Sequence, residues 1–329
     1  MAIVKPDFIF CQVAPNYTVE NGSISGLNTG RYNNRPLYIN NTNAFILAGD
    51  QPIARLAKSQ FLYGTFLAGI QRSDKTKWLQ NCSQIRSFYS PGTMKWEVSD
   101  NDFPGLKITL EVVPLASTTG MAVCAFAEGM QQGDSLIWAF GGSKWFEKQN
   151  LSWKLDVMGQ PELLEWGFVP VDCTDNQIKI DGKNYLVSLM DSTNQSSYFT
   201  VAGSCSVNSK SNVGDASVWN EGNKMNLSKT RNLPLLNGKI PLEKEKTIYW
   251  AFEAFDIDLK VSPLVKSQSR STGRDERGID PQINKSKKSL NPENVFTEGK
   301  KRTNSFKERL KINTPDPYLN VSWRNDKPN

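Results

Sequence analysis

Pairs of closely spaced carboxylates are the side chains of this sequence whose spacing suits acid–base chemistry. Three such pairs stand out, and they are Glu162/Glu165, Asp172/Asp175 and Asp256/Asp258. A glycosidase needs two carboxyl groups roughly 5 to 9.5 Å apart. Asp256 and Asp258, at i and i+2 near the end of an apolar run, would point to the same side of a strand. Pairs of this kind are also common on solvated sheet faces, so they indicate catalysis only weakly.

Other catalytic chemistry is restricted by one missing residue type. The sequence contains no histidine, which excludes Ser-His-Asp and Cys-His catalysis, histidine zinc sites and an imidazole base. It also has no GxGxxG, P-loop, GxSxG or EF-hand pattern. We therefore predict no cofactor, no metal site and no catalytic residue.

Exposed tryptophans are a stronger indication of a ligand, because indole rings stack on the C–H faces of sugars. Of nine tryptophans, Trp145, Trp153, Trp166 and Trp219 fall in connections rich in Gly, Lys and Asn. A large apolar ring in such a segment either packs against another domain or contacts a ligand. We predict carbohydrate or partner binding at Trp145, Trp153 and Trp219, and leave both kinds of contact open.

The cysteines do not form a recognisable framework. Five are present, Cys11, Cys82, Cys124, Cys173 and Cys205, with no CxxC spacing and an odd total. This pattern fits neither a disulfide scaffold nor a metal cluster. Cys124 lies in an apolar run and is expected to be a small buried side chain.

Positive charge is concentrated at the C-terminal end. Residues 1–259 carry 23 Lys/Arg and 25 Asp/Glu, whereas residues 260–329 carry 16 and 8. The basic segment has almost no interleaved aromatic residues and no nucleic-acid-binding motif, so a solvated linker is expected. No run is apolar enough to span a membrane, and no export signal is recognisable. We predict neither nucleic-acid binding nor membrane insertion.

The elements that must position these residues are predicted to be β-strands. In a chain of 329 residues, short apolar or alternating runs recur from about residue 36, separated by turn residues. The runs are 61–70, 85–89 with 94–98, 106–111 with 122–127, 135–140, 178–180 with 185–187, 198–201 and 247–255. The absence of interleaved amphipathic helices predicts an all-β fold, a large antiparallel sandwich.

This sandwich is predicted to span residues 1–259, with Trp96, Trp138 and Trp250 in its core because they lie inside alternating strands. Residues 260–329 are predicted to be a basic linker and a short helix, which would cover residues 296–310 with Ser305 as a possible cap.

Several short segments carry a family resemblance. They are residues 35–38 (Arg-Pro-Leu-Tyr), 43–45, 48–50, 89–94 (Tyr-Ser-Pro-Gly-Thr-Met), 136–142 (Leu-Ile-Trp-Ala-Phe-Gly-Gly) and 312–320. Together they resemble an uncharacterised N-terminal β-sandwich family that precedes (α/α)6-barrel glycosidases related to α-L-rhamnosidases in polysaccharide-degrading bacteria. The last segment resembles the entry to the first helix of such a barrel.

The resemblance implies the architecture and the setting of the chain. The barrel that would carry the catalytic acids of this family is missing after residue 320, so its inverting hydrolysis is assigned to no residue here. The expected protein is a non-catalytic accessory sandwich of a glycoside hydrolase-like protein, periplasmic or secreted, whose partner is an (α/α)6 barrel or an oligosaccharide.

Two alternatives remain open at this stage. The first is an autonomous carbohydrate-binding module, which the tryptophans in the connections favour, and the second is a small glycosidase using an Asp/Glu pair. Tryptophans left without their partner domain would also make a homodimer possible.

Overall fold

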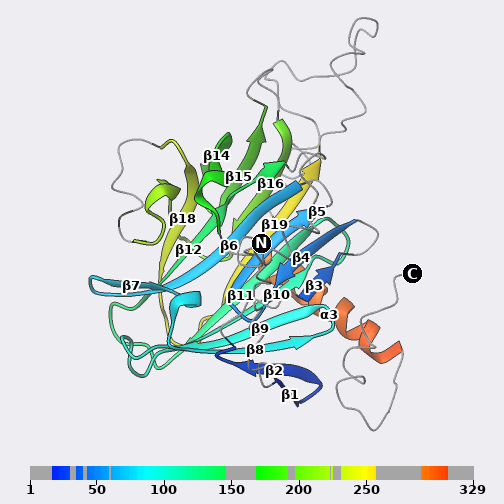
Figure 1. Ribbon diagram of the computed structural model, residues 1–329, viewed down its shortest axis with the longest axis vertical. Coiled ribbons are helices and arrows are strands. Elements are labelled where there is room, and N and C mark those ends of the chain that lie inside the picture. Colours follow the sequence, from blue (N-terminus) through cyan, green and yellow to red (C-terminus); the bar gives the residue numbers. More distant parts are fainter. Residues whose placement is uncertain are drawn as a thin grey trace, which may run out of the picture.

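A computed structural model describes most of the chain (Figure 1). The described residues are 17–29, 35–39, 43–58, 61–145, 168–191, 197–222, 224, 231–256 and 290–309. Nearly all of them belong to two antiparallel sheets, so the predicted all-β sandwich is confirmed. In this part of the chain no helix is both long and apolar enough to cross a membrane.

The first sheet has ten strands in the order β1-β2-β8-β9-β10-β11-β19-β16-β15-β14. Their bounds are β1 (Tyr17–Glu20), β2 (Ser23–Leu27), β8 (Gln84–Ser90), β9 (Thr93–Ser99), β10 (Lys107–Pro114), β11 (Gly120–Glu128), β19 (Ile248–Asp256), β16 (Ser197–Cys205), β15 (Asn184–Met190) and β14 (Asn176–Asp181). Every pair of neighbours in this sheet is antiparallel.

The second sheet has nine strands, seven of them in the order β17-β18-β12-β6-β5-β4-β3, while β7 and β13 also pair with β6. Their bounds are β17 (Lys210–Asp215), β18 (Pro234–Pro241), β12 (Ser135–Gly141), β6 (Phe61–Arg72), β5 (Ile53–Lys58), β4 (Ala44–Ala48), β3 (Arg35–Tyr38), β7 (Lys75–Trp78) and β13 (Lys144–Trp145). In the described part of the chain, short 3-10 helices connect strands at η1 (Leu79–Asn81), η3 (Pro170–Cys173) and η4 (Ala216–Val218).

The core lies between the sheets and follows from the period-2 patterning of the strands. In β9 the buried residues Met94, Trp96 and Val98 alternate with residues that are only half-buried. The same alternation continues in β10, where Leu110 is paired with Trp96. Because alternate side chains of a strand point to opposite faces, one face of each strand enters the core.

All three tryptophans predicted in the core are there. Trp96, Trp138 and Trp250 are fully buried. The indole N–H of Trp96 donates to the carbonyl oxygen of Gly49 at 2.8 Å, which joins the two sheets by a hydrogen bond across the core. A buried indole normally needs such a partner, so this bond helps to fix how the sheets face each other.

The predicted strands are confirmed, but the prediction omitted several other strands. The hairpin around Pro91 and Gly92 forms between β8 and β9, and Gly92 has the positive φ of 73° that a type II turn requires. The prediction missed the strands before residue 61, which are β1 to β5, and also β7, β13 and the β17–β18 pair. All of these are short, or contain Pro, Asn or Gly.

The helix α3 (Pro292–Arg309) begins earlier than predicted. Its cap is Asn291, whose side-chain oxygen accepts a hydrogen bond from the backbone N–H of Asn294 at 3.2 Å. Pro292 occupies the first helical position, where a missing N–H costs nothing. Ser305 lies inside the helix and donates to the carbonyl of Arg302, so its predicted role as a cap is wrong.

Helix α3 packs on the outer face of the ten-stranded sheet. Phe296 is 6% exposed and forms a small apolar cluster with Val113, Leu115 and Ala122. Gly299 makes the close approach possible, because a Cβ atom there would lie 2.5 Å from the carbonyl oxygen of Pro114. In Figure 1 the helix (orange) runs beside the strands that supply these residues. The division of the chain into residues 1–259 and 260–329 stays a prediction.

Candidate functional site

The best-exposed indole of the described residues lies at one end of the nine-stranded sheet. Trp145, in β13, pairs with Phe61 at the start of β6. The preceding Ser143 is held on both sides: its N–H donates to Asn176 Oδ1 at 3.0 Å, and its hydroxyl donates to the carbonyl of Tyr63 at 2.7 Å. The backbone that carries Trp145 is therefore fixed, while its side chain is 39% exposed.

Aromatic rings connect this position to the core. The ring of Trp145 lies 5.0 Å from that of Tyr198 in β16, at an interplanar angle of 43°. Behind them, Phe61 and Phe199 are in edge contact at 5.3 Å, and Phe199 meets Tyr63 at 4.8 Å. Tyr198 was not among the predicted site residues, because only the pairing of strands distant in sequence brings it to Trp145.

Lys144 lies on the other side of β13, because successive strand residues point in opposite directions. Its ammonium group forms an ion pair with Asp172 Oδ1 at 2.8 Å, and the Asp172 side chain is 6% exposed. Asp175 is exposed and has a positive φ of 61°, as expected of a turn residue. Asp172, one member of this predicted acidic pair, therefore connects η3 to β13 through its ion pair with Lys144.

Trp219 has a packing role. It follows η4 and is half-buried against the outer face of the nine-stranded sheet, with its ring 6.2 Å from Trp78 and 5.2 Å from Phe168. Its carbonyl oxygen accepts a hydrogen bond of 2.7 Å from the indole N–H of Trp78. Its predicted contact with a ligand or partner stays a prediction.

The remaining predicted residues fall outside the described part of the chain. They are Trp153, Trp166, Glu162, Glu165, Asp258 and the side chain of Asp256. The backbone of Asp256 is the last residue of β19.

A buried polar network that the sequence analysis missed centres on Asp50. Its carboxylate accepts hydrogen bonds from Thr29 at 2.8 Å, from Ser87 at 3.0 Å and from Tyr17. Arg35 Nη1 completes the network at 2.7 Å. Burial disfavours the charged form of Arg35, but the charge and hydrogen bonds of Asp50 outweigh it and raise the pKa of the guanidinium. The network joins the two sheets.

Two further buried carboxylates are held in the same way. Asp134 receives two parallel hydrogen bonds from Arg72, of 2.6 and 2.7 Å, which lower the pKa of its carboxyl group. Asp100 accepts from Lys77 at 2.9 Å and from the N–H groups of Ser83 and Asp102 at 2.7 and 2.8 Å. Burial alone would raise the pKa of Asp100, but these three bonds lower it.

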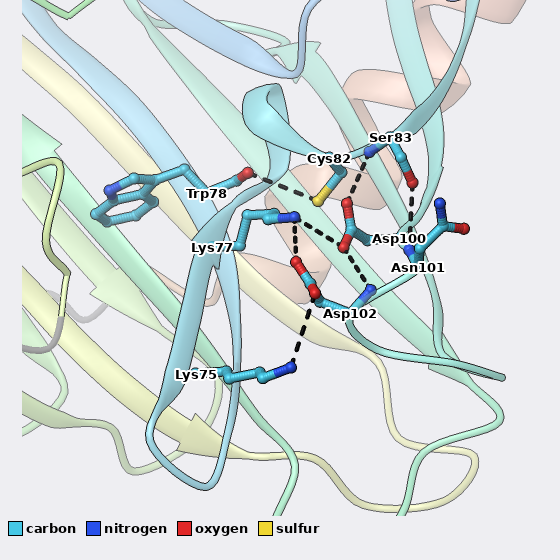
Figure 2. Close-up of polar contacts among 8 residues, drawn as sticks. All are labelled: Lys75, Lys77, Trp78, Cys82, Ser83, Asp100, Asn101 and Asp102. Atoms are coloured by element: carbon cyan, nitrogen blue, oxygen red, sulfur yellow. Dashed lines mark hydrogen bonds and ion pairs between the residues drawn. The ribbon is translucent and has the colours of Figure 1, made fainter.

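Figure 2 shows that Lys77 lies between Asp100 and Asp102, with Lys75 on the outer side of Asp102. The Lys77 ammonium is 2.5 Å from Asp102, and these contacts raise the pKa of the lysine. Since the two lysines belong to β7 and the two carboxylates follow β9, the cluster ties the two sheets together at this end. Its geometry is that of a structural ion pair.

Glu253 in β19 is the exception among the carboxylates. Burial raises the pKa of its carboxyl group, which a hydrogen bond with Thr118 offsets only in part. Within the described ranges no lysine or arginine forms an ion pair with it. A half-buried acid whose pKa is raised in this way destabilises the fold when it ionises.

We therefore expect Glu253→Gln to raise the free energy of unfolding at pH 7. Because the pKa of Glu253 is raised in the folded state, its protonated carboxyl group contributes fully to stability below the unfolded-state pKa of about 4.3. This contribution is lost as the pH rises through the folded-state pKa and the group ionises. The increase in the free energy of unfolding of the variant over the parent chain should disappear near pH 4. Urea unfolding at both pH values measures it, with the exposed Glu298→Gln as control. A variant less stable than the parent at pH 7 would contradict this account.

Cys82, Cys173 and Cys205 are buried, whereas Cys124, which was expected to be buried, is only half-buried. Burial raises the pKa of Cys82, Cys124 and Cys173 to about 12 and that of Cys205 to about 11. Thiols with such values stay protonated at neutral pH and are poor nucleophiles. No group of His, Cys, Asp or Glu side chains suited to a metal ion occurs among the residues that the structure describes.

Comparison with protein families gives one match. Residues 62–270, more than half of the chain, match the model of a domain of unknown function, DUF4450. The chain belongs to this family. The DUF4450 match begins in β6 and includes the strands that carry Trp145 and Tyr198. None of the curated proteins searched matches this DUF4450 chain.

Solved structures of larger enzymes resemble the DUF4450 chain in fold. A putative kojibiose phosphorylase from the human microbiome matches 94% of this chain and 41% of its own, with a TM-score of 0.50 and 10% identity. A bacterial glucoamylase complexed with acarbose matches 87% and 39%, with a TM-score of 0.45 and 9% identity.

A family GH92 inverting mannosidase from Bacteroides thetaiotaomicron matches 87% of this chain and 34% of its own, with a TM-score of 0.40 and 7% identity. The chain thus spans roughly two fifths or less of the length of each of these three proteins. At these identities the likeness concerns the fold alone.

Proposed function

We propose that this chain is a non-catalytic accessory β-sandwich of a glycoside hydrolase-like protein that acts on polysaccharides. The observation that carries the proposal is the state of its buried carboxylates. Asp50, Asp100, Asp134 and Asp172 are each held by a cation at 2.6 to 2.9 Å. A general acid or base must contact its substrate, whereas each of these four carboxylates is buried and contacts a cationic side chain of the same chain.

The unpaired acid Glu253 does not supply a catalytic pair. It is on the same outer sheet face as Tyr249, four residues away in β19, and α3 lies over that region through the contact of Tyr249 with Phe296. Hydrolysis of a glycosidic bond needs a second carboxyl group close to the acid, and no described carboxylate forms such a pair with Glu253. The proposed role is therefore to support a separate catalytic domain.

The proposed partner is an (α/α)6-barrel domain, and its support is the fold. The sandwich matches part of a putative kojibiose phosphorylase over 94% of this chain but only 41% of that protein, so the rest of that protein has no counterpart here. Secretion or a periplasmic location and a homodimer remain predictions beside this proposal.

An assay on the purified chain tests the absence of catalysis. We expect no release of nitrophenol from a panel of aryl glycosides, including the α-L-rhamnoside, the α-D-glucoside and the α-D-mannoside, above the rate without protein. The variant Asp172→Asn, which removes the charge paired with Lys144, should behave identically. Turnover by the parent chain that Asp172→Asn or Glu253→Gln abolishes would refute the proposal.

A further inference from the structure

We propose that Trp145 and Tyr198 form a binding platform for one pyranose ring of a polysaccharide. The inference rests on the proposed function for its choice of ligand class and assigns that class to a place on the sandwich. The two ring centroids are 5.0 Å apart and the ring planes are tilted by 43°, so the rings form an aromatic pair that is open to solvent at Trp145, which is 39% exposed. The C–H face of a pyranose packs against such a surface.

The platform is rigid before any ligand arrives. The backbone of β13 is held by pairing with β6 and by the hydrogen bonds of Ser143 with Asn176 and Tyr63. The Lys144–Asp172 ion pair fixes the opposite side of the same strand. Behind the platform, Phe61 and Phe199 fill the end of the core. Binding to a preformed surface loses little conformational entropy, which favours a weakly interacting ligand such as a sugar.

The size of the exposed surface favours a sugar over a protein partner. The exposed large apolar residues of the described chain are Leu27, Tyr38, Trp145, Val169, Val171 and Ile180. They are distributed over β2, β3, β13, the η3 region and β14. Val169 and Val171 lie close to Asp172 in the chain, and Asp172 pairs with Lys144 on the side of β13 opposite to Trp145. A protein interface needs a broad contiguous surface, whereas one indole beside one phenol matches the area of a single sugar ring.

Trp145 is also placed where scaffolds of this class present ligands. It follows the last strand residue of β12 by only four positions and stands at the end of the sandwich, where the connections between strands begin. Such ends tolerate variation without loss of the core and therefore carry binding residues.

Affinity gel electrophoresis tests the platform with defined probes. The full chain is run in native gels containing amylopectin, galactomannan or mixed-linkage β-glucan. We expect at least one of these polysaccharides to retard the parent chain, and Trp145→Ala to weaken that retardation by about tenfold in apparent Kd. Trp145→Phe, which keeps a flat ring, should retain part of the binding.

Tyr38→Ala is the matched control, because it removes another exposed aromatic ring from a different strand, β3. It should bind as the parent does, and all variants should melt within a few degrees of it. Three outcomes would overturn the inference: no retardation by any probe, equal retardation of Trp145→Ala and the parent, or loss of self-association in Trp145→Ala without sugar binding. None of these changes the outcome of the aryl glycoside assay, so the two proposals can fail separately.

Discussion

Trp250→Ala is expected to lower the free energy of unfolding by about 3 to 5 kcal/mol. The ring is fully buried and lies 5.3 Å from Phe66 and 6.0 Å from Trp138, which belong to the opposite sheet. Its removal leaves a cavity between two sheets whose spacing is fixed by many other contacts, so the surrounding residues cannot collapse into it. Chemical denaturation measured by fluorescence or circular dichroism gives the change directly.

Trp145→Ala is the natural comparison, because it removes the same side chain from an exposed position. Its cost should be about 1 kcal/mol or less. Trp250→Phe adds a second check, since it keeps much of the ring and removes an indole N–H that has no hydrogen-bond partner in the described structure. It should cost less than the alanine variant. Equal losses for Trp250→Ala and Trp145→Ala would mean that the assignment of one ring to the core and the other to the surface is wrong.

Asp50→Ala should destabilise the fold by a similar amount, about 3 to 5 kcal/mol. The substitution leaves Arg35, whose side chain is 16% exposed, without the carboxylate that neutralises it. It also removes the common acceptor of Tyr17, Thr29 and Ser87. Most of the loss comes from the charge and the donors that lose this buried carboxylate as their acceptor.

A matched carboxylate at the surface separates this effect from ordinary loss of an ion pair. Asp102 contacts Lys77 and Lys75 but is 46% exposed, so Asp102→Ala should cost about 1 kcal/mol or less. Thermal melts at low and high salt compare the two variants. A loss for Asp50→Ala no larger than that for Asp102→Ala would show that the Asp50 network contributes little to joining the sheets.

The strands that could be predicted from the sequence are those whose apolar residues alternate. The run around Leu110 has this pattern, and the structure confirms both the strand and its pairing with β11. The strand β18 does not show it, because Pro234 and Pro241 bound it and Asn237 lies in its middle. Asn237 is buried and donates to the carbonyl of Leu235, so a polar residue occupies a position where the pattern calls for an apolar one.

The composition of helix α3 made the start of this helix difficult to predict from the sequence. Among its described side chains, only Phe296 is large, apolar and buried on the sheet, and Gly299 lies where a Cβ atom would be 2.5 Å from the carbonyl oxygen of Pro114. A helix that packs through small residues has a weak apolar periodicity, so its start could not be placed from the pattern. The Asn291-Pro292 capping signal was present in the sequence and would have placed it correctly.

The tryptophans in the connections show the limit of local sequence for a candidate site. Trp145 and Trp219 lie in segments of similar composition, yet one is exposed and the other packs on Trp78, 141 residues away in the chain. Which indole is covered depends on strand pairings between distant segments. The sequence therefore provided candidates for a binding surface but could not rank them.

The cysteine thiols that the structure describes can act as chemical reporters for separate regions of the molecule. Cys124 is half-buried and packs against the cluster that contains Phe296, Cys173 is the buried last residue of η3, and Cys205 is in the core between the sheets. A maleimide reagent can reach a buried thiol only when its cover opens. Detachment of α3 would therefore increase the labelling rate of the half-buried Cys124, whereas labelling of Cys205 reports opening of the whole sandwich. Comparing the two rates would separate local from global unfolding without any engineered probe.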